Sequence, residues 1–275
     1  MKTSGITLTL GLAGLALLSA CGGSNSDKEK SKVDSSKIAA AKPKPGDPIK
    51  YDSSKRYIFL TWDDSPQPPG TTNCKKVFTE QGVKATFFVV GMNAYSQRGV
   101  RIIDSLKNDY PQFLTANHSY SHAAKVGYKG FYLRPDSVIA DFMKCQAEFN
   151  FPTKIVRLPG MNSWVGKGVM KGPQSSLNVC KRFDSLGYNV IGWDIEWTNK
   201  GAEPKESVTE MLRKVNYVFD NGTGHEENAI VILSHDRLFG KQQYADSLTK
   251  FISVLKQDPR NVFETIDHYP MVQRK

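Results

Sequence analysis

Apolar runs that alternate with stretches of helical periodicity most constrain the fold of this chain. Seven runs rich in β-branched and aromatic residues recur along it: 57–61, 85–90, 113–116, 154–158, 189–193, 229–233 and 261–266. Six stretches with helical spacing separate them: 72–81, 99–109, 136–149, 174–186, 205–219 and 242–256. Nearly continuous apolar strands that alternate with helices are typical of a parallel sheet covered by helices. We therefore predict an α/β fold, with either an open sheet or a barrel; seven strands and six intervening helices fit a (β/α) barrel, complete or incomplete.

Polar residues gather where five of these predicted strands end. The clusters are Asp63-Asp64, His118 to His122, Arg157 to Gly160, Asp194 to Trp197 and Leu233 to Asp236. In parallel α/β barrels the C-terminal ends of the strands share one face, and active sites lie there. One such cluster could be a capped turn, but five at equivalent ends predict a catalytic rim.

Two of the clusters have the composition of a metal site. His118 and His122 are four residues apart, so on a helical turn both imidazoles would project from the same face. A carboxylate from another strand end would complete the three protein ligands of a catalytic zinc-type site and leave one position open. The alternative interpretation is a pair of surface histidines beside an acidic turn.

The first residues have the pattern of an export signal. Lys2 precedes an apolar stretch over 6–18, which is too short and too glycine-rich for a membrane span. The small residues that lead into Cys21 resemble the end of a bacterial lipoprotein signal, in which cleavage precedes a lipidated cysteine; an ordinary secretory signal is the alternative. We predict a signal peptide over 1–20 and an exported, membrane-anchored lipoprotein that faces the periplasm or the cell exterior.

The segment that follows differs in composition from the rest of the chain. Residues 21–50 are rich in Ser, Lys, Asp, Gly and Pro and carry few large apolar side chains. Such a segment cannot bury enough surface to offset its ordering entropy, so we predict a disordered tether. Residues 51–275 have the length and apolar content of one domain with a full hydrophobic core.

Charge and cysteine content limit the partners and the cross-links. Of the formal net charge of +10, +5 belongs to the domain after residue 56, and this moderately basic balance favours anionic envelope polymers or lipid head groups. Nucleic acid is not expected, because no nucleic-acid-binding motif is present. If Cys21 is lipidated, Cys74, Cys145 and Cys180 remain, which allows one intramolecular disulfide and leaves one thiol free; the sequence does not select the pair. The oligomeric state is not indicated.

In their order along the chain, the clusters resemble the five motifs of the polysaccharide deacetylases, carbohydrate esterases of the NodB-homology type. The resemblance extends over about 55–268. The Asp-Asp and His-x-x-x-His motifs are specific when they occur together, whereas Arg-x-Pro-Gly and Leu-x-His gain weight from their order. The resemblance implies a distorted (β/α) barrel and a metal-dependent hydrolase that removes acetyl groups.

The resemblance also implies roles for the motif residues. Asp64, His118 and His122 would bind a divalent metal, with zinc the expected ion, which polarises the acetyl carbonyl and lowers the pKa of bound water. Asp63 would be the general base, ionised at neutral pH because a nearby dication keeps its pKa low. Arg157 would hold this base through a charge-assisted hydrogen bond, unless it caps a helix C-terminus instead.

The later motifs would complete the reaction. His235 would be the general acid that protonates the departing amine or alcohol. The Gly160 N–H would stabilise the oxyanion. Leu233 and Trp197 would shape the acetyl and sugar pocket, whereas Trp62 is expected to belong to the core.

Two positions depart from the family pattern. Ser65 stands where the family has a glycine, so it must tolerate an unusual backbone angle or the loop must shift. Glu196 stands where the family has an aspartate that orients the motif-five histidine. Either the longer side chain of Glu196 still reaches His235, or Asp194 takes over this role.

The sequence thus predicts an extracytoplasmic, lipid-anchored enzyme that removes N-acetyl groups from an N-acetylglucosamine-containing envelope or extracellular polysaccharide. Peptidoglycan, poly-N-acetylglucosamine and chitin fragments are the candidate glycans. One alternative is an O-acetyl esterase, such as an acetylxylan esterase, with the same rim. Two others are a catalytically impaired glycan-binding lipoprotein, which the Glu196 change would permit, and an envelope assembly factor that only docks partners.

Overall fold

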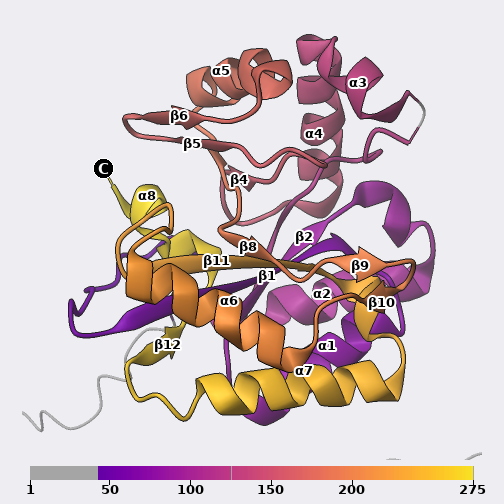
Figure 1. Cartoon of the computed structure of the whole chain (residues 1–275). Coiled ribbons are helices and arrows are strands. Elements are labelled where there is room, and N and C mark those ends of the chain that lie inside the picture. Colours follow the sequence, from indigo (N-terminus) through magenta and orange to yellow (C-terminus); the bar gives the residue numbers. More distant parts are fainter. Residues whose placement is uncertain (1–42, 125, 275) are drawn as a thin grey trace, which may run out of the picture. The chain divides into compact units, whose positions relative to one another are not determined.

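A curled half-barrel sheet of mainly parallel strands forms the centre of the structure (Figure 1). The computed structural model describes residues 43–124 and 126–274. The strand order is β6-β5-β7-β4-β3-β2-β1-β11-β8, and β12 pairs with the beginning of β1. Since this path ends at β6 and β8, the barrel is not closed among the described residues. The predicted α/β class and distorted (β/α) barrel are confirmed.

All seven predicted strands are present. The parallel strands are β1 (Arg56–Ser65), β2 (Ala85–Val89), β3 (Phe113–Asn117), β4 (Ile155–Val156), β7 (Asn189–Val190), β8 (Ile195–Glu196), β11 (Ala229–His235) and β12 (Asn261–Phe263). The sequence did not indicate the two-residue strand β8. It also did not indicate the antiparallel pair β5 (Trp164–Gly166) and β6 (Val169–Lys171), nor the small sheet of β9 (Asn199–Lys200) and β10 (Glu203–Pro204). The count of seven strands is therefore too low.

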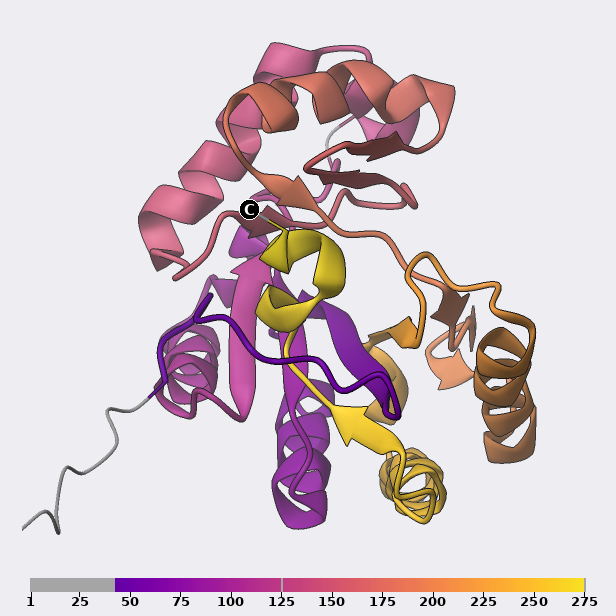
Figure 2. The same cartoon turned by 90° about the vertical axis from the view of Figure 1, so that its left-hand side faces the viewer.

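Helices cover the sheet in two groups (Figures 1 and 2). The six predicted helices are α1 (Gly70–Gln81), α2 (Gln97–Asn108), α4 (Pro135–Phe149), α5 (Leu177–Ser185), α6 (Val208–Asn221) and α7 (Gln242–Leu255). The shorter elements are α3 (Gly127–Tyr132), α8 (Pro270–Gln273) and the 3₁₀ turns η1 (Gly91–Ala94), η2 (Gln174–Ser176), η3 (Asp236–Phe239) and η4 (Ile266–His268). Helices α4 and α5 pack together near β4 and β7, whereas α1, α6 and α7 pack near β1 and β11.

Strand β1 shows why its apolar run is continuous. Side chains alternate across a strand, and here both faces are buried. Ile58, Leu60 and Trp62 pack into the cluster that α1, α6 and α7 cover. Tyr57 and Phe59 enter a second cluster on the opposite face. Trp62 is fully buried, so its prediction as a core residue is confirmed. With both faces fixed, the end of β1 has a defined position in the rim.

The segment just before β1 belongs to the folded domain. The Gly46 N–H donates to Asp267 Oδ2 at 2.9 Å, and the Tyr110 hydroxyl donates to Lys44 O at 3.1 Å. The predicted disordered tether is therefore wrong for residues 43–50, which these polar contacts and the packing of Ile49 against the core hold in place. The predicted signal peptide, Cys21 and the rest of the tether lie outside the described residues.

The three described cysteines are free and buried. Cys74, Cys145 and Cys180 lie in three different clusters of the core, which keeps them from pairing with one another. Burial raises the pKa of Cys145 to about 12, as expected of an unreactive core thiol. Within residues 43–124 and 126–274, no helix has the length and apolar character needed to cross a membrane.

Candidate metal centre and active site

Asp64, His118 and His122 converge where β1 and β3 end. One ligand atom of each lies within 4.8 Å of those of the other two. Nε2 of His122 is 3.1 Å from Asp64 Oδ1, and Nε2 of His118 is 3.7 Å from the same oxygen. The two imidazole centroids are 5.0 Å apart. The three predicted ligands are thus close enough to share one ion.

The surroundings of these residues fit a divalent metal. Asp64 Oδ1 is buried and has no hydrogen-bond partner among the described residues, so a cation would supply the interaction that it lacks. His118 Nδ1 is 2.8 Å from Arg157 O, which leaves Nε2 as the ligand atom. Burial lowers the pKa of His118 to about 4, so this imidazole is neutral, as metal ligation requires.

The two histidines meet in a different way from the predicted helical turn. They lie on an irregular turn in which Ser119 and His122 have positive φ values of 71° and 51°. The Ser119 N–H donates to Asn117 Oδ1 at 2.9 Å, and the His122 N–H donates to Ser119 Oγ at 3.0 Å. These side-chain bonds replace the helical ones, because short polar residues compete for backbone groups. The prediction of a shared helical turn is wrong, although the rings still converge.

Asp63 and Asp64 both reach the site although they are neighbours on β1. Neighbouring side chains of a regular strand point to opposite faces. Here Asp64 has a φ of 68°, and the pairing of β1 with β2 shifts register between Trp62 and Ser65. The Asn93 side chain donates to Asp64 O at 2.7 Å and holds this conformation. The irregularity turns both carboxylates toward the histidines.

Ser65 stands where the family has a glycine, but it does not need the positive φ that glycine allows. The residue with the positive φ is Asp64. The Ser65 hydroxyl donates to Asp236 Oδ2 at 2.7 Å, and the Thr71 hydroxyl donates to the same oxygen. Asp236 is fully buried, and this burial raises its pKa to about 7. The sequence did not predict this network, which joins the ends of β1 and β11 to the start of α1.

Arg157 makes the predicted contact with Asp63. Its Nη1 lies 2.9 Å from Asp63 Oδ1 and also donates to Thr61 Oγ1 at 2.8 Å. Its Nε and Nη2 donate to the carbonyls of Ile191 and Gly192 at 3.1 and 2.8 Å. These acceptors follow β7 and end no helix, so the helix-capping alternative is wrong. The guanidinium is fully buried and is held on all sides.

The electrostatics of the two aspartates differ. Burial raises the pKa of Asp63, and Arg157 opposes that rise. The low pKa predicted for Asp63 is therefore tied to the presence of the cation. Burial also acts to raise the pKa of Asp64, but His122 and His118 keep it below its ordinary value.

His235 ends β11 directly beside Asp63 in the sheet register. Its Nδ1 is buried and has no hydrogen-bond partner among the described residues. The predicted contact with Glu196 or Asp194 is therefore not formed. The Asp194 carboxylate instead accepts the N–H groups of His225 and Val231 at 2.6 and 2.7 Å. This prediction of an oriented acid is wrong, because the one carboxylate is used by the backbone and the other does not reach the ring.

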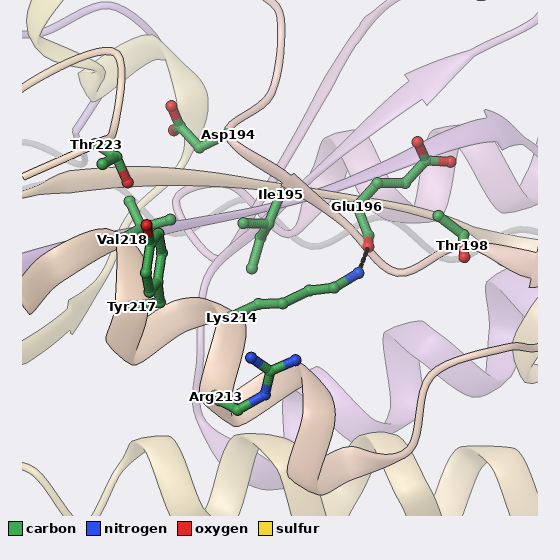
Figure 3. A pocket seen from close by; sticks show the side chains of 9 residues that line it. All are labelled: Asp194, Ile195, Glu196, Thr198, Arg213, Lys214, Tyr217, Val218 and Thr223. Carbon is green, nitrogen blue, oxygen red and sulfur yellow. Dashed lines mark hydrogen bonds between the residues drawn. The ribbon is translucent and has the colours of Figure 1, made fainter. Parts of the chain in front are cut away.

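Glu196 borders a separate cavity of about 490 Å³ between β8 and α6. Figure 3 shows the carboxylates of Asp194 and Glu196 directed away from Lys214, whose Nζ donates to Glu196 O at 3.1 Å. The cavity is lined by Asp194, Ile195, Glu196, Thr198, Arg213, Lys214, Tyr217, Val218 and Thr223. None of the three candidate metal ligands is among them, so this hollow is not the catalytic centre.

The other predicted pocket residues occupy different environments. Gly160 is exposed with a φ of 66°, and its N–H makes no hydrogen bond to another described residue, so it is a free donor. Leu233 is buried in β11. Trp197 is 1% exposed and packs edge-on against Phe239 and Phe251. The prediction that the Trp197 ring walls the sugar pocket is wrong, since that ring lies in the core.

Two residues near the metal centre were not predicted from the sequence. Arg237 Nη1 is 2.6 Å from Asp64 Oδ2, and its side chain is about one-third exposed. The Tyr128 ring lies 5.8 Å from that of His122, between centroids. Both come from segments outside the recognised motifs, and neither has a local sequence signal. Only the tertiary fold brings them to the rim.

Part of the chain is similar to a known protein family. Residues 50–154 match the family model described as polysaccharide deacetylase. That segment contains Asp63, Asp64, His118 and His122 but ends before Arg157 and His235.

Solved structures show the same fold. A CE4 esterase from Streptococcus mutans has a TM-score of 0.58 and 23% identity, over 77% of this chain and 86% of that one. A peptidoglycan deacetylase from Bacillus subtilis has a TM-score of 0.55 and 19% identity, over 81% of this chain and 94% of that one. The catalytic domain of a peptidoglycan N-acetylglucosamine deacetylase from Eubacterium rectale has a TM-score of 0.54 and 20% identity, over 86% of this chain and 98% of that one. At these identities the likeness is one of fold.

Proposed function

We propose, from the membership of residues 50–154 in the polysaccharide deacetylase family, that this protein is a metal-dependent hydrolase that removes N-acetyl groups from an N-acetylglucosamine-containing polysaccharide. The observation that carries this proposal is the convergence of Asp64, His118 and His122 beside Asp63, which a buried arginine holds. Two of the structurally similar proteins are peptidoglycan deacetylases, which supports an N-acetylated glycan as the substrate.

Asp64, His118 and His122 would hold the metal, and we propose zinc for this set of one carboxylate and two imidazoles. When bound, such an ion polarises an acyl oxygen and lowers the pKa of water. Arg157 keeps the Asp63 carboxylate in one position, since three further acceptors fix the guanidinium. This arrangement supports Asp63 as the base that takes a proton from the attacking water.

The remaining residues would act on the acyl group and the leaving group. The Gly160 N–H is free to donate to the acyl oxygen as it gains negative charge. His235, beside Asp63, would give a proton to the departing amine of the sugar, which ends the reaction with free acetate and a glucosamine unit. Leu233, on the same strand, would contribute an apolar surface near the acetyl group.

Acetate release tests this proposal. The purified full-length protein would be incubated with N-acetylglucosamine oligomers, peptidoglycan and acetylxylan, with a chelator and with added zinc. We expect chelator-sensitive release from an N-acetylated glycan. Release from acetylxylan alone would overturn the proposed substrate and make the protein an O-acetyl esterase.

A second candidate function follows from the unpartnered Nδ1 of His235. An imidazole without an orienting carboxylate is a poorer general acid, so the chain could instead be a glycan-binding protein with impaired turnover. Tight binding of zinc-loaded protein to N-acetylglucosamine oligomers, with no acetate released, would favour this function over the first.

We also propose that the protein is an exported lipoprotein anchored through Cys21, on the sequence pattern of the first 21 residues alone. Growth of the native host with a labelled fatty acid would test this. Label is expected on the wild-type protein and not on Cys21→Ser. Equal labelling of both would contradict the anchor.

A further inference from the structure

The Tyr128 side chain lies at the edge of the metal centre. It belongs to α3, and its ring stands edge-on to His122 with an interplanar angle of 73° and a centroid distance of 5.8 Å. The side chain is 43% exposed, so it faces both the candidate ligand and solvent. The next turn of α3 is tied to the rim, because the Tyr132 hydroxyl donates to Pro159 O at 2.7 Å. The position of Tyr128 is therefore set by the fold.

Tyr128 also contacts Gly160. A Cβ placed on Gly160 would lie 2.8 Å from Cε2 and 2.9 Å from Cζ of the tyrosine ring. Any side chain at this position would collide with the ring, so the two residues fit only because one is glycine. Cζ is the carbon that carries the hydroxyl. The ring edge that includes Cζ thus faces Gly160, the residue whose free N–H is the proposed oxyanion donor.

The Tyr128 hydroxyl is available to a ligand. No hydrogen bond joins it to another residue within the described part of the chain. The charged groups that act on it are Asp64, Arg237 and Asp63, all of which belong to the metal centre or contact it. A phenol without a partner, at the edge of the metal centre, is a donor available to a ligand there.

We propose that the Tyr128 hydroxyl is a second hydrogen-bond donor to the acyl oxygen of the substrate, next to the Gly160 N–H. This inference rests on the proposed function. As the carbonyl carbon becomes tetrahedral, its oxygen gains charge, and a fixed donor at that oxygen lowers the barrier more than it strengthens ground-state binding. Tyr128 would then act on turnover rather than on substrate affinity.

Paired substitutions separate the hydroxyl from the ring. Tyr128→Phe keeps the ring against His122 and Gly160 and removes only the donor, whereas Tyr128→Leu removes both. Tyr217→Phe is the matched control, because Tyr217 is an exposed tyrosine on α6, beside the other cavity. In the zinc-loaded full-length protein we expect Tyr128→Phe to lower kcat by about 10- to 100-fold, with KM changed by less than about twofold. Zinc content should equal that of the wild type.

A binding measurement provides a readout that does not depend on turnover. Acetate already carries the negative charge that the acyl oxygen of the substrate gains only during turnover. Calorimetric titration of the zinc-loaded protein with acetate should therefore give about tenfold weaker binding for Tyr128→Phe than for the wild type and Tyr217→Phe. If the wild type releases no acetate from any glycan but this difference persists, the proposed function fails, while Tyr128 remains a hydrogen-bond donor to a ligand oxygen at the metal centre. If Tyr128→Phe matches the wild type in kcat and acetate affinity, the assignment is wrong, even when Tyr128→Leu is impaired.

Discussion

The two halves of the rim differ in how firmly their side chains are held. In the half built on β1 and β3, Asp63 is fixed by Arg157, and a backbone carbonyl sets the orientation of His118. In the half that ends β11, His235 has a buried Nδ1 with no partner among the described residues. The first half is organised before any ligand arrives. The second depends on the substrate, or on a small movement, to orient its imidazole.

This difference indicates which catalytic groups are held in a fixed geometry before the substrate binds and which are not. A base and a metal site need fixed geometry, because errors of an ångström reduce rates strongly. The acid is needed only when the leaving group departs, so its orientation can be supplied late. The largest effects of substitution should therefore come from the first half of the rim.

Substitution of the metal centre should have the largest effect. His122→Ala should lose both zinc and acetate release, because it removes one of three ligands. Asp63→Asn should retain zinc and lose about 10²- to 10⁴-fold in kcat, since the amide keeps the shape but cannot accept the proton. Zinc content and acetate release would be measured on the same samples. Near-wild-type activity in Asp63→Asn would show that another group is the base.

Arg157→Met should have the next largest effect, which is on stability. Removal of the guanidinium leaves the Asp63 carboxylate buried without its partner, which costs about 3–5 kcal/mol of unfolding free energy. Urea denaturation of the metal-free protein measures this cost. Arg182→Met is the matched control, because Arg182 forms an exposed ion pair with Asp136 and should change stability by less than about 1 kcal/mol. Equal stability of the two variants would contradict the claim that Arg157 fixes Asp63 in the half of the rim built on β1 and β3.

Asp236, which joins the two halves, should make stability depend on pH. Burial raises the folded pKa of Asp236 to about 7, above its ordinary value of 3.8, so the folded state holds a proton that the unfolded state releases. The contribution of Asp236 is complete below pH 4 and is lost as the pH rises toward 7. We expect the metal-free wild type to lose about 3–4 kcal/mol of unfolding free energy over this window relative to Asp236→Asn. Parallel pH profiles of the two proteins would contradict this.

Of these substitutions, Glu196→Asp should have the smallest effect, and it tests whether His235 can be oriented by a carboxylate. If the shorter carboxylate reaches Nδ1, it raises the pKa of His235 and keeps the acid protonated at higher pH. The alkaline limb of the kcat profile should then move to higher pH, with a kcat gain of about tenfold at most. Glu203→Asp is the control, because Glu203 pairs with Lys241 on the surface. An unchanged limb would mean that position 196 does not govern the acid.

Much of the fold could be predicted from local sequence. The apolar runs of β1, β2 and β11 are buried on both faces, so their pattern alone identifies them. The pair β5 and β6 has only three residues in each strand, which is too short for a periodic signal. Residues 43–50 contain too few apolar residues for order to be predicted from the sequence. A hydrogen bond to the carboxylate of Asp267 nevertheless helps to hold them.

The identities of the site residues could be predicted, but their conformations could not. Asp64, His118 and His122 were found from residue type and position at strand ends. The left-handed backbone of Asp64 and the irregular turn before His122 depend on side-chain bonds that have no fixed spacing. The core position of Trp197 and the rim position of Tyr128 arise from packing between segments that are distant in sequence.

Stoichiometric restoration of activity by metal tests the central claim most directly. The full-length protein would be stripped with a chelator, dialysed and titrated with zinc, while acetate release from N-acetylglucosamine oligomers is followed. We expect no release from the stripped protein, full recovery at one zinc per chain, and no recovery in His122→Ala. Release that persists after complete removal of metal, or that returns equally in His122→Ala, would contradict it.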